Sequence, residues 1–358
     1  MITLVIGGQY GGEGKGKIAA FLSSKEEFTA VCRTGGVNSK HTVVQNGKQY
    51  DLRQIPTAAA VRMPGKIIYG AGSLVHVPTL FEEMKLLNVP RSAILIDKQT
   101  GIITEDCILD ERGDPLYKEL GSTLTGVNYA TARRALRKLT LAKDVPELQG
   151  MTGDVAETLA RYIQSGKNIL VEGHQSMGLS NYHGDYPYTT SRDSTAAELL
   201  SELGVGPRVA LRIIVVIKAF PTRNHNGRLP NEMTITEANA LGIEEYGGGS
   251  WGIKNNRRRV ARIEHQDIKR AVLLNTATEL ALTGADYLDH KLIRATSSSN
   301  LSAEVQSFIR DIENAAEVPV TLISTGPQTE AMIEIESLPD DITQRISTSP
   351  LLGKPVIK

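Results

Sequence analysis

Short apolar runs rich in β-branched residues alternate along the chain with longer stretches in which apolar positions recur at helical spacing. The short runs are bounded by glycine, proline or polar turns, which is typical of buried strands. We expect strands at residues 3–6, 93–96, 168–171, 209–217 and 318–323. We expect helices at residues 155–165, 194–203, 128–143 and 268–282. This alternation predicts an α/β protein with a large, mainly parallel central sheet flanked by helices. There is no internal repeat or low-complexity linker, so we expect residues 1–358 to form a single large domain with insertions.

The charge balance narrows the classes of partner. The 358 residues carry 40 Lys and Arg against 40 Asp and Glu, so bulk electrostatics does not favour binding to nucleic acid or to an anionic membrane. The longest apolar run, at residues 213–217, is far shorter than the roughly 20 residues of a membrane helix. Two cysteines cannot form a disulfide framework, and the N-terminus has no signal-peptide pattern. We therefore expect a soluble cytoplasmic protein, in the host cytoplasm if the chain is viral.

A glycine-rich segment follows the first expected strand, at residues 7–17, and leads into an expected helix. Backbone N–H groups beside a helix N-terminus suit phosphate oxygens, and Lys15 and Lys17 add positive charge. The loop is P-loop-like, but it lacks the Gly-x4-Gly-Lys-Ser/Thr spacing of a Walker A sequence. The alternative is a flexible turn with two solvated lysines.

This segment, Gly-Gly-Gln-Tyr-Gly-Gly-Glu-Gly-Lys-Gly-Lys, resembles the N-terminal signature of the adenylosuccinate synthetases, Gly-x-Gln-Trp-Gly-Asp-Glu-Gly-Lys-Gly-Lys. The resemblance recurs along most of the chain. It implies a homodimeric ligase that joins L-aspartate to the 6-position of IMP through a 6-phosphoryl intermediate, with Mg²⁺ and GTP. Lys15 would then be catalytic. The loop residues that would bind the nucleoside triphosphate are Gly11, Gly12, Glu13, Gly14, Lys15, Gly16 and Lys17.

A second motif, at residues 33–42, resembles the family's Gly-Gly-x-Asn-Ala-Gly-His-Thr. His41 would be the general acid toward the phosphorylated 6-oxygen, a role that suits an imidazole because its pKa lies near the operating pH. Asn38 would contact the reacting nucleotide, and Lys40, His41 and Thr42 would line the triphosphate site. The backbone carbonyls of Gly12 and Lys40 would bind Mg²⁺. Taken alone, His41 would more often be a histidine of a surface loop, and it is the motif that favours the catalytic interpretation.

Two further motifs point to the substrate mononucleotide. Residues 121–127 resemble the family's cradle for the 5′-phosphate, in which Ser122 and Thr123 would donate hydrogen bonds. Arg133 matches an arginine that reaches the phosphate of the neighbouring subunit, although a solvated helix charge is an equal alternative. Gln175 would donate to the developing 6-oxyanion and act as a catalytic residue, and Thr190 matches a second phosphate donor. His174 stands where the family has alanine, and its role is open.

The remaining motifs concern aspartate and the base of the triphosphate. Residues 245–259 resemble the family's aspartate-binding loop, in which Arg258 and Arg259 would bind a carboxylate; a solvated basic turn is the alternative. Asp286, Ser324 and Gly326 match the pocket for the guanine base. Gly284 replaces a lysine of that pocket, so ATP is a candidate donor beside GTP.

The departure with the largest consequence is Gly12, where the family carries an aspartate that acts as general base at N1 of IMP. Glycine leaves room for the 2-amino group of guanine. The chain therefore resembles the phage and archaeal relatives that convert (d)GMP to N6-succino-2-amino-(2′-deoxy)adenylate, and this is the preferred hypothesis. The alternatives are an ordinary adenylosuccinate synthetase acting on IMP, a nucleotide-binding regulator without catalysis, and a P-loop kinase or GTPase.

Overall fold

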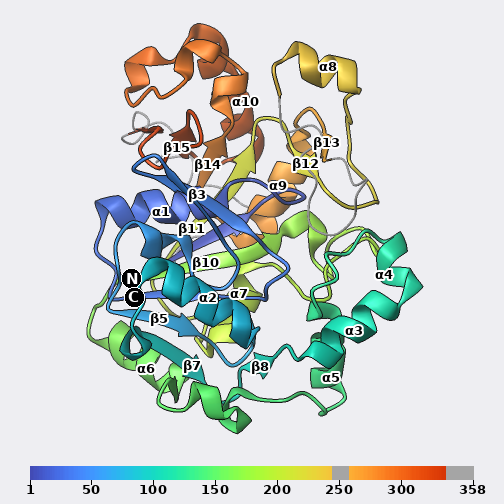
Figure 1. The fold of residues 1–358 in the computed structure, drawn as a ribbon. Helices are drawn as coiled ribbons and strands as arrows, with labels where there is room; N and C mark the ends of the chain where they lie inside the picture. The colour runs from blue at the N-terminus through green and yellow to red at the C-terminus, as the bar shows by residue number, and fades with distance from the viewer. Residues whose placement is uncertain (244–257, 336–358) are drawn as a thin grey trace.

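A central sheet of ten strands organises the protein in the computed structural model, which describes residues 1–243 and 258–335. Neighbouring strands are parallel except for β16, which is antiparallel to β15. The order across the sheet is β16 (Met332–Glu334), β15 (Val320–Ser324), β14 (Glu279–Thr283), β11 (Leu211–Lys218), β1 (Ile2–Gly7), β10 (Ile169–Ser176), β2 (Ala30–Arg33), β5 (Lys66–Tyr69), β7 (Ile94–Asp97) and β9 (Thr152–Gly153). The expected α/β architecture is confirmed (Figure 1).

Helices and small ladders surround this sheet. The helices are α1 (Lys15–Lys25), α2 (Val77–Leu87), α3 (Glu105–Gly113), α4 (Pro115–Glu119), α5 (Val127–Ala135), α6 (Val155–Gln164), α7 (Ala196–Leu203), α8 (Ile235–Ala240), α9 (His265–Asn275) and α10 (Ala303–Ala316). The two-stranded ladders pair β3 (His41–Gln45) with β4 (Lys48–Leu52), β6 (Leu74–Val75) with β8 (Gly101–Ile102), and β12 (Thr222–Arg223) with β13 (Arg259–Val260). Among the described helices, none is both long and apolar enough to cross a bilayer.

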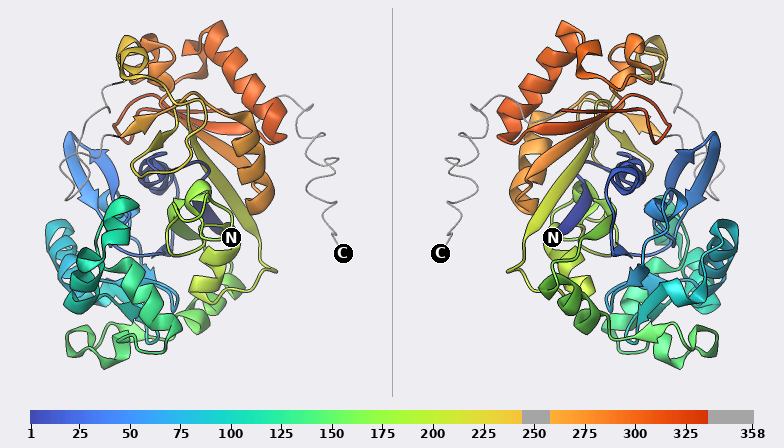
Figure 2. Two further views of the ribbon diagram at one scale, coloured as in Figure 1. Left: turned by 90° about the vertical axis from the view of Figure 1, so that its right-hand side faces the viewer. Right: turned by 90° about the vertical axis from the view of Figure 1, so that its left-hand side faces the viewer.

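The central strands are buried on both faces, which explains why the sequence of β11 is an almost continuous apolar run. Successive residues of β1 point to opposite faces. Val5 packs in a core cluster with Ile18 and Phe21 of α1, whereas Leu4 packs in a cluster with Leu199 of α7. Figure 2 shows helices on both sides of the sheet. The sheet therefore lies between two apolar layers, which pack against its strands from both faces.

Two of the expected helices are wrong in extent. The helix expected at residues 128–143 ends as α5 at Ala135, and Arg137 has a left-handed backbone with φ 61°. The helix expected at residues 268–282 ends as α9 at Asn275, and Thr276 is left-handed with φ 46°. The following apolar residues enter the sheet as β14, where every residue is buried. A buried strand and a buried helix have the same apolar composition over such a short run, so periodicity alone could not separate them.

The carboxyl ends of the parallel strands bring the sequence motifs together. β1 ends at Gly7, β2 at Arg33, β10 at Ser176, β14 at Thr283 and β15 at Ser324, and one of the segments singled out above lies at or directly after the end of each. Parallel α/β sheets bind ligands at this edge. The fold therefore assembles the candidate site from segments more than 300 residues apart in the chain, as the contact between Lys17 and Ser324 shows.

Candidate active site

The loop between β1 and α1 forms a glycine-lined cradle that is held in shape by its own acidic residue. Gly11, Gly12 and Gly14 have φ of 104°, 72° and 91°, in the left-handed region that favours glycine. The Glu13 carboxylate accepts hydrogen bonds from the N–H groups of Gln9 and Gly11 at 3.2 and 2.8 Å. The α1 helix begins with no side-chain cap, so its first N–H groups face the cradle. This arrangement suits a phosphate group.

Lys15 lies buried beside this cradle. Its Nζ is 3.2 Å from Glu13 Oε2 and 3.4 Å from Ser176 Oγ, and the residue is only 4% exposed. Burial alone would raise the pKa of the Glu13 carboxyl, but Lys15 and the hydrogen bonds hold that pKa below its ordinary value. Lys15 and Glu13 are thus an ion pair at the point where β1 and β10 end. The catalytic role of Lys15 stays a prediction.

The Lys17 side chain contacts a different part of the chain, the segment that begins at Ser324. Its Nζ donates to Ser324 Oγ at 2.6 Å, to the carbonyl of Ala331 at 2.7 Å and to the carbonyl of Gly326. Burial lowers its pKa to about 7, although Asp286 and Glu330 oppose the shift. Lys17 therefore joins the first helix to the segment expected to hold the triphosphate base. Its predicted contact with the triphosphate stays a prediction.

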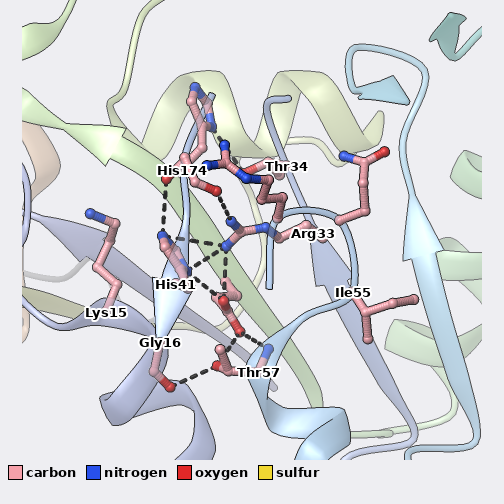
Figure 3. Close-up of polar contacts among 12 residues, drawn as sticks. Lys15, Gly16, Arg33, Thr34, His41, Ile55, Thr57 and His174 are labelled. Carbon is pink, nitrogen blue, oxygen red and sulfur yellow. Dashed lines mark hydrogen bonds and ion pairs between the residues drawn. The ribbon is translucent and has the colours of Figure 1, made fainter. Parts of the chain in front are cut away.

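His41 is held by a buried carboxylate that the sequence analysis did not single out. Glu172 Oε1 lies 2.6 Å from His41 Nδ1 and 2.8 Å from Arg33 Nη1 (Figure 3). Burial and the Arg33 charge lower the pKa of His41 to about 3, with Glu172 opposing them. The imidazole is therefore neutral, and in one tautomer it donates its Nδ1 proton to Glu172. Glu172 lies within β10, directly after the strand expected at residues 168–171, and nothing in its sequence position marks it as a partner of His41.

The same carboxylate ties the histidine to the phosphate-binding loop. Glu172 Oε2 accepts from the Thr57 N–H and hydroxyl, each at 2.8 Å. The Thr57 hydroxyl also lies 2.7 Å from the carbonyl of Gly16. A Cβ on Gly16 would lie 2.8 Å from Cβ of His41, so glycine is what allows strand β3 to approach the start of α1. The structure thus brings His41 and the lysine loop together, and their catalytic roles stay predictions.

The hairpin that carries His41 also touches the far end of the chain. Both the N–H and the hydroxyl of Thr329 donate to the carbonyl of Val44, at 2.9 and 2.8 Å. Val44 lies on the same strand as His41 and Thr42. Lys40 and Thr42 both contact Asp51 at the exposed side of the hairpin. One strand therefore connects the histidine with the segment after Ser324.

The residues expected around the mononucleotide lie on separate segments, and Gln175 lies within strand β10. Asn38 is half-buried between β2 and β3, and Thr190 is held by a hydrogen bond from its N–H to the carbonyl of Leu179. Gln175 has a left-handed backbone with φ 42°, an uncommon conformation that often marks a functional site. These positions are compatible with the predicted roles, which stay predictions.

The expected phosphate cradle is organised by a second buried carboxylate. Glu111 Oε1 accepts from the Ser122 hydroxyl at 2.9 Å, and Glu111 Oε2 accepts from the N–H of Asn128 at 3.0 Å. The Thr123 hydroxyl lies 3.2 Å from that of Thr125. Leu124 keeps a left-handed backbone, with φ 53°, where the resemblance expects glycine. Sequence reasoning missed Glu111 because nothing in its own motif marks it.

Arg133 and its neighbour face different surroundings. Arg133 pairs with Asp110 at 2.7 Å near the surface. Arg134 instead donates to the carbonyl of Ala71 at 2.8 Å and lines a cavity of about 340 Å³ together with Ser191, which follows Thr190. The predicted role of Arg133 is not tested by this geometry. Arg134 is the second candidate for a phosphate contact on this helix.

The structure describes only some of the residues predicted to bind the substrate aspartate and the base of the triphosphate. Residues 244–257, which include most of the predicted aspartate loop, lie outside the described part of the chain. Arg258 Nε donates to Asn224 Oδ1 at 3.1 Å, and Arg259 pairs with Glu232. Asp286 follows β14, and Gly326 follows β15, so the two expected base-pocket segments leave adjacent strands.

His174 is a packed residue. It is 1% exposed, its Nδ1 lies 3.2 Å from the Thr34 hydroxyl, and burial lowers its pKa to about 4. A Cβ on Gly35 would lie 2.3 Å from its ring, so the histidine supports the backbone that leads to Asn38. This agrees with a structural role.

The predicted Mg²⁺ ligands are backbone oxygen atoms, which suit an ion that binds together with a triphosphate. Within residues 1–243 and 258–335, no three His, Cys, Asp or Glu residues cluster as metal ligands. Both Glu13 oxygens already accept hydrogen bonds, and Gly12 has no carboxylate. That the backbone carbonyls of Gly12 and Lys40 bind Mg²⁺ stays a prediction, and Mg²⁺ is commonly bound through substrate phosphates as well. When bound, the ion would neutralise phosphate charge.

A lysine-bearing glycine loop at the carboxyl edge of a parallel sheet places the chain among the α/β proteins that bind phosphate. The family model of adenylosuccinate synthetase matches residues 4–147 and 139–294, and the chain belongs to this family. It is therefore a C–N ligase of the adenylosuccinate synthetase type, a nucleotide-binding enzyme of purine biosynthesis.

Its relatives include the adenylosuccinate synthetase of Methanocaldococcus jannaschii, 40% identical over 340 residues, which cover 94% of this chain and 97% of the relative. The enzyme of Pyrococcus horikoshii is 40% identical over 337 residues, with 93% and 98% covered. A fully ligated adenylosuccinate synthetase of Plasmodium falciparum has a TM-score of 0.85 at 19% identity, covering 93% of this chain and 99% of that one. Succinoaminodeoxyadenylate synthetase of cyanophage S-2L, bound to dGMP and dATP, has a TM-score of 0.79 at 23% identity, with 98% of both chains covered. Both likenesses confirm the fold.

Proposed function

We propose that the protein joins L-aspartate to C6 of a purine mononucleotide at the expense of a nucleoside triphosphate, and that IMP is the substrate best supported by its relatives. The observation that carries the activity is the placement of His41 against the Lys15 loop by Glu172 and Thr57. The relatives at 40% identity are adenylosuccinate synthetases, and they favour IMP over the (d)GMP of the preferred sequence hypothesis.

The reaction needs two transfers. The γ-phosphoryl group moves from the triphosphate to O6 of the purine while N1 loses its proton, and the nucleoside diphosphate leaves. The aspartate amine then attacks C6, a proton leaves the amine, and the O6 phosphate departs. Lys15 and the loop N–H groups hold the phosphates. A neutral His41 can donate one hydrogen bond to a phosphoryl oxygen in the tautomer that carries its proton on Nε2, with Nδ1 accepting from Arg33 Nη1 at 2.6 Å.

A second candidate substrate, dGMP or GMP, is favoured by one specific observation. Gly12 has no carboxylate where the family carries its general base, and its backbone is left-handed, with φ 72°. Guanine differs from hypoxanthine by the 2-amino group beside N1. A glycine at this position offers that group backbone acceptors and no competing carboxylate.

A competition assay decides between the two substrates. The enzyme is incubated with aspartate, Mg²⁺ and ATP or GTP, together with equal concentrations of IMP, GMP and dGMP, and the succinyl products are separated by mass. Adenylosuccinate as the main product supports IMP, whereas a succinylated 2-aminopurine nucleotide supports the second candidate. Absence of any aspartate-dependent product would refute the ligase function and favour a binding regulator.

We further propose that the active form is a homodimer and that residues 1–358 form one domain. The homodimer rests on the resemblance of the motifs, and the single domain rests on the lack of an internal repeat or low-complexity linker in the sequence. The donor is proposed to be GTP or ATP, because Asp286 is retained while Gly284 replaces the family's lysine. The same assay, run with each triphosphate separately, measures this preference.

A further inference from the structure

Thr222 lies directly against the loop that carries Gly12. It belongs to the two-residue strand β12 and is 2% exposed. Its hydroxyl donates to the carbonyl of Gly11 at 3.1 Å. Because Gly11 and Gly12 both have left-handed backbones, this hydrogen bond holds a peptide in a conformation that side chains rarely adopt.

The same hydroxyl occupies the space where a side chain at position 12 would begin. A Cβ built on Gly12 would lie 2.8 Å from Thr222 Oγ1, closer than a Cβ approaches its neighbours in proteins. An aspartate at position 12 therefore meets two obstacles, its own backbone conformation and the Thr222 hydroxyl. Removing that hydroxyl would remove the second obstacle and free the Gly11 carbonyl.

Strand β12 has little freedom to move away. Thr222 pairs with Val260 of β13, and the carbonyl of Pro221 accepts from the N–H of Ala261 at 2.9 Å. On the other side, the guanidinium of Arg223 lies 5.3 Å from the centre of the Tyr10 ring and donates to the carbonyl of Tyr188. The strand is thus held between the first loop and the end of the candidate aspartate loop.

We propose that Thr222 is a specificity-determining positioning residue. Its hydroxyl fixes the Gly11 peptide and fills the place of a side chain at position 12, so that backbone rather than a side chain faces the N1–C2 edge of the purine. This inference rests on the proposed function. Thr222 acts on substrate choice through Gly12 and takes no part in either transfer.

The test is a double-mutant cycle of Gly12→Asp and Thr222→Ala, with Thr222→Ser as the matched control that keeps the hydroxyl. For each variant, kcat and KM are measured with IMP and with dGMP, and their Kd values are measured by calorimetry. The quantity compared is the ratio of kcat/KM for IMP to kcat/KM for dGMP, together with the ratio of the two Kd values. A general loss of stability would not change these ratios.

Gly12→Asp should change the IMP-to-dGMP ratio in both backgrounds. We expect this change to be at least about threefold larger when Thr222 is present than when it is replaced in Thr222→Ala, since residues in contact couple energetically. Thr222→Ser should leave the ratio at the wild-type value. Independent effects of the two substitutions, or equal ratios for Thr222→Ser and Thr222→Ala, would overturn the proposal. Failure of the proposed function would show separately, as wild-type enzyme that forms no aspartate adduct; the Kd ratios would then still decide the role of Thr222.

Discussion

Lys17 links protein stability to pH through a buried amine. Its Nζ reaches Ser324, Gly326 and Ala331 from the first turn of α1, and burial lowers its pKa from 10.5 to about 7. The folded protein releases this proton near pH 7, whereas the unfolded chain releases it only near pH 10.5. Between these values the unfolded state binds more protons, so raising the pH stabilises the folded protein.

The size of the effect follows from the shift. Each pKa unit corresponds to about 1.4 kcal/mol of differential protonation free energy. Between pH 7 and pH 9 the folded amine is mostly neutral and the unfolded amine is still charged. We therefore expect Lys17 to add about 2 kcal/mol to the free energy of unfolding over this interval. Below pH 7 the penalty for burying the charged amine is fully present.

The assay is urea unfolding of the wild type and of Lys17→Met at pH 7 and at pH 9. The methionine keeps the apolar stem and cannot titrate, so its free energy of unfolding should change by about 2 kcal/mol less than that of the wild type. Lys25→Met is the control on the same helix, because the Lys25 side chain is 53% exposed. Parallel pH dependences of the wild type and Lys17→Met would refute the reasoning.

Three further results are expected. Glu172→Gln should lower kcat by about 10²-fold with little change in KM for the triphosphate, because the carboxylate orients His41; unchanged steady-state kcat would contradict this. Arg134→Met should raise KM for the mononucleotide more than Arg133→Met does, since only Arg134 lines the cavity beside Ser191, and the opposite order would restore the sequence-based assignment. Leu199→Ala should cost about 2–5 kcal/mol in urea unfolding, because Leu199 is fully buried; a cost below 1 kcal/mol would show that the core collapses around it.

Much of the fold could be predicted because apolar runs bounded by turns mark buried strands. The strands expected at residues 3–6 and 209–217 correspond to β1 and β11. The short edge strands and the ladders such as β12 with β13 carry little periodicity, since two residues of strand cannot show a pattern. They are set by contacts with segments far away in the chain.

The motif residues of the site could be found, but the residues that orient them could not. His41 and Lys15 stand in recognisable glycine-rich contexts, whereas Glu172 and Glu111 become visible only through their partners in space. Thr222 likewise has no local signal, because its contact with Gly11 spans 211 positions of the chain. A sequence pattern reports neighbours along the chain, whereas these supporting contacts come from residues that are close only in the folded structure.

The short strand β3 connects two parts of the predicted site. It carries His41 at one end, and three residues further its Val44 carbonyl accepts two hydrogen bonds from Thr329, in the segment that follows Ser324 and Gly326. The predicted general acid and the segment predicted to bind the base of the triphosphate therefore share one structural support, although they lie almost at opposite ends of the described chain.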